Sequence, residues 1–189
     1  MPQGEALRMF DLQRIYHTGM AVADIGAAQA SIGQALHLEW APVRSFEPLP
    51  FWTPEDGAHE VIVHATYSRQ GPHHLELVQG TGGFYDPDRA PDSRHIGVWV
   101  DYLPAEAERL LALGWQTVAA GASPDDGFGP IAYLRPPIPG LLVELVSIGL
   151  KPMIDEWIAG RTLNKSSPAR GEDLHVARRA RLPPAAPPG

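Results

Sequence analysis

The chain repeats one sequence pattern twice, and this duplication constrains its fold more than any other feature. The segment HTGMAVAD begins at His17 and reappears as HIGVWVD from His95. Each copy continues into a stretch with helical periodicity, and each half ends in an apolar strand around one glutamate, LELV with Glu76 and VELV with Glu144. We therefore expect two tandem copies of one structural module.

Within each copy the pattern predicts one strand, one helix and then three strands, so the expected class is α+β, with two tandem βαβββ modules that form a cupped mixed sheet. Pro104 and Gly114 are typical of the beginning and end of the second helix. The first copy is the longer one, and its extra Pro-rich and aromatic segment, 48–57, predicts a lid. The predicted strands lie at 14–24, 39–46, 59–69, 74–80, 93–101, 115–121, 130–136 and 141–148.

The modules leave additional sequence at both ends of the chain. The segment 151–163 predicts an amphipathic helix with Met153, Ile154, Trp157 and Ile158 on one side, which covers the sheet or, alternatively, contacts a second copy in a homodimer. The composition of the C-terminal tail, 164–189, is typical of disorder. The expected organisation is an N-terminal extension (1–13), a first module (14–92), a second module (93–150), a C-terminal helix (151–163) and a Pro/Arg-rich tail (164–189).

Composition excludes several classes of function. The chain has no cysteine, so disulfides, thiolate metal sites and a cysteine nucleophile are ruled out. The net charge of −7 leaves an acidic body, which argues against a nucleic-acid partner. No signal peptide or membrane-length apolar run is present, so we expect a cytoplasmic protein without a membrane partner. The GTGG sequence at 80–83 precedes prolines rather than a helix, and no G-x-S-x-G motif occurs.

Four titratable residues occupy equivalent positions in the two halves. Each half has a histidine at the start of its first strand and a glutamate in its last strand, namely His17, Glu76, His95 and Glu144. Taken singly, such residues are more often structural or solvent-facing, but their repetition favours a shared role. Buried carboxylates need a partner, and two imidazoles with two carboxylates suit one divalent ion of Zn, Ni, Co, Mn or Fe. The sequence therefore predicts a metal site between the halves.

Residues near these four positions are candidates for the walls of a substrate pocket. The small residues Gly19 and Gly97 follow the two histidines at the same spacing and are expected to leave room for an ion and a ligand. His74 shares a strand face with Glu76. The predicted substrate-binding residues are His74, Phe51, Trp52, Trp99 and Tyr133, whose aromatic character favours a bulky or aromatic small molecule.

The same residues resemble the vicinal oxygen chelate superfamily, which includes glyoxalases, methylmalonyl-CoA epimerases, extradiol dioxygenases and bleomycin-resistance proteins. The resemblance covers about residues 14–148. It rests on HTGMAVADIGAA and RHIGVWVDYLPAEAERLLALGW, which look like module openings, and on YLRPPIPGLLVELVSI, which looks like the closing strands of the glyoxalase-like and epimerase-like branch.

This resemblance implies that the four positions hold one metal ion in the cupped sheet and that Glu144 or Glu76 moves the substrate proton. Glu76 stands where epimerases usually have glutamine and therefore favours a glyoxalase. However, the Arg and Asn residues that hold glutathione in glyoxalases have no match in this chain, whose one asparagine is Asn164. Glutathione dependence is therefore doubtful.

The expected function is a metal-dependent lyase, isomerase or epimerase that abstracts a proton next to a carbonyl and stabilises the resulting enolate on the metal. Glu144 or Glu76 is the expected base. Two alternatives stay open. One is an Fe(II)-dependent extradiol-type dioxygenase that uses His17, His95 and Glu144 while Glu76 stays outside the metal shell. The other is a non-catalytic small-molecule-binding protein of the resistance type.

Overall fold

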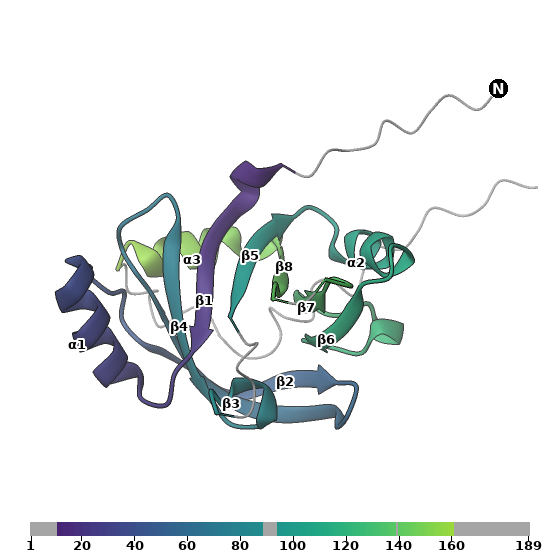
Figure 1. The fold of residues 1–189 in the computed structure, drawn as a ribbon, viewed down its shortest axis with the longest axis horizontal. Helices are drawn as coiled ribbons and strands as arrows, with labels where there is room; N and C mark the ends of the chain where they lie inside the picture. Colours follow the sequence, from purple (N-terminus) through teal and green to yellow (C-terminus); the bar gives the residue numbers. More distant parts are fainter. Residues whose placement is uncertain (1–10, 89–93, 139, 161–189) are drawn as a thin grey trace, which may run out of the picture.

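Eight strands form a sheet that closes into a barrel, with α-helices packed against it (Figure 1). The computed structural model describes residues 11–88, 94–138 and 140–160. The end of the predicted C-terminal helix, 161–163, and the tail predicted to be disordered, 164–189, lie outside these residues, as does most of the predicted N-terminal extension.

Two successive runs of strand, helix and three strands make up the barrel, which confirms the predicted α+β class with tandem βαβββ modules. The first run contains β1 (Ile15–Ala21), α1 (Ile25–Leu36), β2 (Arg44–Thr53), β3 (Gly57–Tyr67) and β4 (His74–Gly80). The second contains β5 (His95–Val100), α2 (Leu103–Ala112), β6 (Gln116–Ala120), β7 (Ile131–Arg135) and β8 (Val143–Ser147). The remaining elements are α3 (Lys151–Ile158) and the short 3-10 turns η1 (Leu12–Arg14), η2 (Gly83–Tyr85), η4 (Pro124–Asp126) and η5 (Ile148–Leu150).

The two modules meet through equivalent strands. The order around the barrel is β1-β4-β3-β2-β6-β7-β8-β5, so β1 lies beside β5 and β2 lies beside β6. The β1–β5 junction is antiparallel and pairs Gly19 with His95 and His17 with Gly97. The β2–β6 junction is narrow and joins Trp52 to Ala120. The first strands of both modules therefore run side by side in opposite directions.

The segment 48–57 is not the lid that its composition predicts. Residues up to Thr53 belong to β2, and β3 begins at Gly57 after a tight turn. The register of β2 on β3 shifts between Phe46 and Leu49, beside Pro48. Proline is tolerated at bulges and on strands with an unpaired edge, and β2 has such an edge because it meets β6 only near its end. The prolines therefore mark an edge strand, and the predicted strand 39–46 lies too early in the chain.

The core consists of two clusters on opposite faces of the sheet. Neighbouring residues of β5, Val98 and Trp99, belong to different clusters because strand side chains alternate between faces. The Val98 cluster packs under α2, which buries Leu103, Ala107 and Leu110. The second cluster gathers most of the aromatic residues around the histidines and glutamates of the predicted site.

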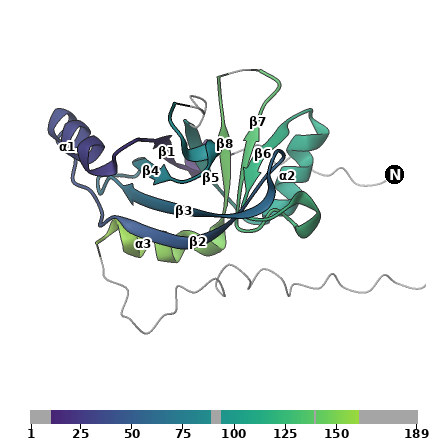
Figure 2. The ribbon, with the colours of Figure 1, turned by 90° about the horizontal axis from the view of Figure 1, so that it is seen from below.

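Helix α3 packs against the aromatic cluster alongside β2 (Figure 2). Ile154 and Trp157 are buried, and the Trp157 indole N–H donates a hydrogen bond of 2.7 Å to the Pro42 carbonyl. The predicted apolar side of this helix thus lies in the core of its own chain. None of the helices in the described ranges is long and apolar enough to cross a membrane.

Candidate metal centre

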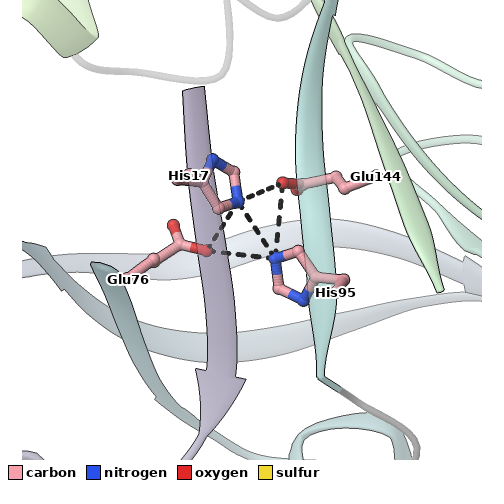
Figure 3. Close-up of side chains that lie close together, drawn as sticks. All are labelled: His17, Glu76, His95 and Glu144. Carbon is pink, nitrogen blue, oxygen red and sulfur yellow. Dashed lines mark hydrogen bonds and ion pairs between the residues drawn. The ribbon is translucent and has the colours of Figure 1, made fainter. Parts of the chain in front are cut away.

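The four residues predicted to bind metal converge between β1 and β5 (Figure 3). Each offers one donor atom, and these four atoms all lie within 4.8 Å of one another. The two histidines come from the adjacent strands β1 and β5, and the glutamates approach from opposite sides on β4 and β8. The sequence therefore identified a real spatial cluster from residues up to 127 positions apart, from His17 to Glu144.

Strand register explains the convergence. In the first module Glu76 lies level with Gly19, and Gly19 pairs in turn with His95 of the second module. The mirrored row joins Glu144, Gly97 and His17. Each histidine is therefore in register with the glycine and the glutamate of the opposite module, and both rows point to the same face of the sheet.

The two glycines make room for imidazole rings. A Cβ atom added to Gly97 would overlap the His17 ring, and one added to Gly19 would overlap the His95 ring and lie 2.8 Å from Glu76 Oε2. The sequence correctly indicated that space is needed at these positions. However, the expectation that this space receives an ion and a ligand was wrong, because the histidine of the other module fills it.

The distances between donor atoms match those of ligands around one ion. His17 Nε2 lies 3.1 Å from both His95 Nε2 and Glu144 Oε2, and 3.4 Å from Glu76 Oε2. His95 Nε2 lies 3.2 Å from Glu76 Oε2 and 3.6 Å from Glu144 Oε2. Metal–ligand bonds of about 2.0–2.2 Å separate neighbouring donors by about 3.0–3.5 Å. The four donor atoms are thus close enough together to surround one ion.

The cluster buries two carboxylates, and ion pairs join both of them to imidazoles. Relative exposures are 0% for His17, 6% for Glu76, 5% for His95 and 5% for Glu144. Among the ion pairs of the described ranges, both glutamates pair with histidine alone. A divalent cation would balance two carboxylates, and these N and O donors suit Zn, Ni, Co, Mn or Fe. The residues therefore fit the predicted ion.

The electrostatic surroundings keep Glu76 ionised. Burial by itself raises the pKa of Glu76, but the neighbouring His17 and His95 imidazoles and the Tyr67 hydroxyl outweigh it, so that the pKa lies below its ordinary value. Ring contacts hold His17, whose centroid lies 4.3 Å from that of Tyr16 and 5.6 Å from that of Tyr67. Its buried Nδ1 has no hydrogen-bond partner within the described part of the chain.

Two predicted substrate-binding residues lie in the aromatic cluster around the centre. Tyr133 packs edge-on against His95, with ring centroids 5.2 Å apart. Trp99 stacks on Tyr16 at 3.9 Å, and Tyr16 in turn contacts His17. Tyr133 therefore lies directly beside the centre, whereas Trp99 lies one side chain further away.

Of the other three predicted substrate-binding residues, His74 is in register with His17 on the adjacent strand, whereas Phe51 and Trp52 lie on β2, which borders neither β1 nor β5. Phe51 is buried and packs on Phe84, and Trp52 projects from the opposite face of β2. His74 donates a hydrogen bond of 2.8 Å from Nδ1 to the carbonyl oxygen of Ser68, in the turn before β4. Burial lowers the pKa of His74.

Tyr67 lies beside the centre but was not predicted from the sequence. It contacts His17 and lies directly across from Glu76 on the neighbouring strand. Tyr133 has the same relation to Glu144 in the second module. The repeated tyrosine in the third strand of each module, in HATY and in IAY, is the sequence signal that identifies Tyr67.

Comparison with protein families agrees with this fold. Residues 16–133 match the model of the glyoxalase/bleomycin resistance protein/dioxygenase superfamily. The chain belongs to this superfamily, which confirms the resemblance found in the sequence.

Several solved structures are similar to the chain at low sequence identity. A hypothetical protein from Bacillus halodurans is 18% identical, with a TM-score of 0.49, over 70% of this chain and 92% of its own. A methylmalonyl-CoA epimerase variant from Streptomyces coelicolor, in complex with 2-nitronate-propionyl-CoA, is 21% identical, with a TM-score of 0.48 and coverage of 72% and 95%. The epimerase from Mycobacterium tuberculosis is 18% identical, with a TM-score of 0.48 and coverage of 74% and 93%. No curated protein matches the sequence significantly.

Proposed function

We propose that the chain is a metal-dependent lyase, isomerase or epimerase that removes a proton next to a carbonyl group of a small molecule. The observation that carries the proposal is the buried cluster of two imidazoles and two carboxylates, His17, Glu76, His95 and Glu144. Two carboxylates neutralise a divalent ion and leave it a moderate Lewis acid. Such an ion is better suited to stabilising charge on a substrate oxygen than to generating a strong hydroxide nucleophile.

The chain's own residues divide the work between holding the ion and moving the proton. His17 and His95 present Nε2 atoms 3.1 Å apart and would hold the ion. When bound, a divalent ion supplies stabilisation of the negative charge that develops on the substrate oxygen. Glu144 or Glu76 accepts the substrate proton at its carboxylate, because both carboxylates already lie among the donor atoms. The near-complete burial of all four residues keeps bulk water away from the proton transfer.

The position of Glu76 favours this chemistry over that of an Fe(II)-dependent dioxygenase. Oxygenation needs two histidines and one carboxylate, with the remaining positions open for substrate and O₂. Glu76 Oε2 lies 3.2 Å from His95 Nε2, as close as the other donors, which supports a shell with two carboxylates. Retention of all four donors in one buried cluster also favours an enzyme over a non-catalytic binding protein.

The aromatic surroundings support a bulky or aromatic substrate. Tyr67 and Tyr133 contact the two histidines, and Trp99 lies behind Tyr16. Aromatic faces favour apolar or aromatic groups over small, highly charged acids. Glutathione dependence stays doubtful because the chain lacks a match to the residues that would hold it.

The first test is elemental analysis of the purified full chain beside the His95→Ala variant. We expect about one divalent ion per chain in the wild type and a large loss in the variant, because the variant lacks a donor. Unchanged metal content in His95→Ala would contradict the ligand assignment. If the wild type contains no metal and its thermal stability does not change when a chelator is added, the result would favour the alternative of a non-catalytic small-molecule-binding protein.

The second test follows proton exchange directly. Carbonyl compounds with an acidic neighbouring C–H, including aromatic ones, are incubated with the metal-loaded protein in D₂O, and NMR records the loss of the C–H signal. We expect exchange with the wild type and its loss in Glu144→Gln or Glu76→Gln, whichever residue is the base. Iron-dependent O₂ uptake without exchange would instead favour the dioxygenase.

A further inference from the structure

A tyrosine faces each of the two glutamates across a pair of antiparallel strands. Tyr67 on β3 lies opposite Glu76 on β4, and Tyr133 on β7 lies opposite Glu144 on β8. Opposite residues of such a pair project from the same face, with Cβ atoms about 5 Å apart. Both tyrosines are buried, with exposures of 4% and 3%. Each phenol ring therefore lies on the same side of the sheet as the carboxylate of its module.

Each of these tyrosines also contacts the histidine of its own module. The rings of Tyr67 and His17 meet edge-on, with centroids 5.6 Å apart and planes at 68°. The rings of Tyr133 and His95 meet in the same way, at 5.2 Å and 81°. Each module thus supplies a histidine, a glutamate and a tyrosine in mutual proximity. Packing alone would require only an aromatic ring, whereas both modules have a ring with a hydroxyl group.

The hydroxyl groups are hydrogen-bond donors next to anions. Burial, followed by the charge of Glu76, raises the pKa of Tyr67 well above its ordinary value. Burial and then Glu144 have the same effect on the pKa of Tyr133. A phenol is protonated at neutral pH, and a buried phenol that faces a carboxylate across two paired strands is stabilised by donating a hydrogen bond to it.

We propose that Tyr67 and Tyr133 are positioning residues that hold Glu76 and Glu144 so that each carboxylate presents a single oxygen to a shared metal ion. In both glutamates Oε2 is the oxygen that faces the imidazoles. A hydroxyl that donates to the carboxylate competes for its remaining lone pairs and so prevents the second oxygen from also binding the ion. This inference rests on the proposed function.

For the proposed proton abstraction, one-oxygen binding by both glutamates would leave coordination positions of the metal ion free. Two imidazole nitrogens and two single carboxylate oxygens leave positions for a substrate that binds through two oxygens, whereas two bidentate carboxylates would fill the shell. The phenol also keeps the carboxylate oriented while it takes up a proton. The tyrosines would therefore control how many positions the protein leaves open.

Tyr85 provides a matched control. It is as buried as Tyr67 and Tyr133, and its hydroxyl group is hydrogen-bonded to that of Tyr133, so that it feels the charge of Glu144 without being hydrogen-bonded to that carboxylate. Replacing it with phenylalanine removes the same atom from the same aromatic cluster, one step further from the carboxylates. An effect that arises from loss of any buried hydroxyl would appear in Tyr85→Phe, whereas an effect on carboxylate binding mode would not.

The test compares the full-length wild type with Tyr67→Phe, Tyr133→Phe and Tyr85→Phe after loading with Co(II). Affinity is measured by competition with a coloured chelator, and the visible d–d spectrum reports the coordination number. We expect affinity to fall about 10–100-fold in Tyr67→Phe and Tyr133→Phe, as is typical when an outer partner of a metal ligand is lost. We also expect their d–d bands to weaken as a freed carboxylate adds its second oxygen. Tyr85→Phe should match the wild type.

Wild-type affinity and spectrum in both Tyr67→Phe and Tyr133→Phe would overturn the inference, as would equal changes in Tyr85→Phe. Infrared spectra of the metal-loaded wild type give an independent answer if a variant fails to fold. A wide separation of the carboxylate stretching bands indicates one-oxygen binding, and a narrow separation would overturn the inference. If the wild type binds no Co(II), both this inference and the proposed function fail. If it binds Co(II) and the tyrosine variants are unchanged, only this inference fails.

Discussion

Replacing Gly97 with alanine should displace the His17 imidazole from the candidate metal centre. The added Cβ would overlap three atoms of the ring, Cε1, Nδ1 and Nε2, far inside ordinary van der Waals contact, which begins at 3.4 Å. The ring cannot move sideways freely, because it is fully buried and packs against Tyr16 and Tyr67. The ring therefore has to shift away from Gly97, which displaces its Nε2 atom relative to the other three donor atoms.

The size of the effect follows from this overlap. Restoring contact requires a movement of about 1 Å or more, and a misplacement of about 1 Å in a preorganised site can reduce its function about 100-fold. We expect the affinity for Zn or Co(II) to fall by at least that factor, equivalent to about 2.7 kcal/mol. Overpacking should also lower the free energy of unfolding of the metal-free protein by about 1–3 kcal/mol.

The assay is a competition titration with a coloured chelator, paired with thermal unfolding in the presence and absence of metal. Gly83→Ala is the matched control, because no heavy atom outside its immediate neighbours lies within 4 Å of an added Cβ. Wild-type metal affinity in Gly97→Ala would refute the reasoning, since the centre would then form without the observed position of His17. A loss of affinity in Gly83→Ala of the same size would also refute it.

Two further predictions concern stability. The folded-state pKa of Glu76 lies below its ordinary value of 4.5, so the stabilisation that its carboxylate provides is lost as this group becomes protonated. The free energy of unfolding of the metal-free protein should therefore decrease as the pH falls below about 4.5. Urea titrations from about pH 6 to pH 3 should show a weaker decrease in Glu76→Gln, and an equal decrease would contradict the assignment. Trp157→Ala should lower the free energy of unfolding by about 3–5 kcal/mol in the same assay, because it leaves a cavity beside Tyr67 in the core. As a control, Leu36→Ala, at an exposed position, should change this free energy by less than about 0.5 kcal/mol. A loss below about 1 kcal/mol in Trp157→Ala would mean that α3 contributes little to the core.

The duplication made the cluster of His17, Glu76, His95 and Glu144 predictable from sequence. A single histidine or glutamate in a strand carries little information, because most such residues are structural or exposed. Here, however, the same two residue types occur at equivalent positions of both copies. With the single assumption that the two halves face each other, this repetition predicts that the four side chains lie close together. The structure brings these four side chains within 4.8 Å, so the repeat predicted contacts between residues far apart in the chain.

The extent of β2 could not be read in the same way. Prolines at 48 and 50 argue for a loop when only the local sequence is considered. They are accommodated because β2 is paired along its length with β3 and meets β6 only around Trp52. This pairing is a property of the closed barrel, and no local pattern reports it. Tyr67 was missed for a different reason, since a tyrosine in a strand is usually an ordinary core residue.

The way in which the modules exchange residues makes the candidate centre inseparable from the duplication. His17 packs over Gly97 and is in register with Glu144, whereas His95 packs over Gly19 and is in register with Glu76. Neither half therefore contains a complete row, and an isolated module would leave its histidine without the glycine that accommodates it and without the facing carboxylate. Loss of one of the four donor side chains should accordingly loosen the junction between β1 and β5 and weaken the binding of a metal ion. Selection for metal binding would then also preserve the contact between the two modules.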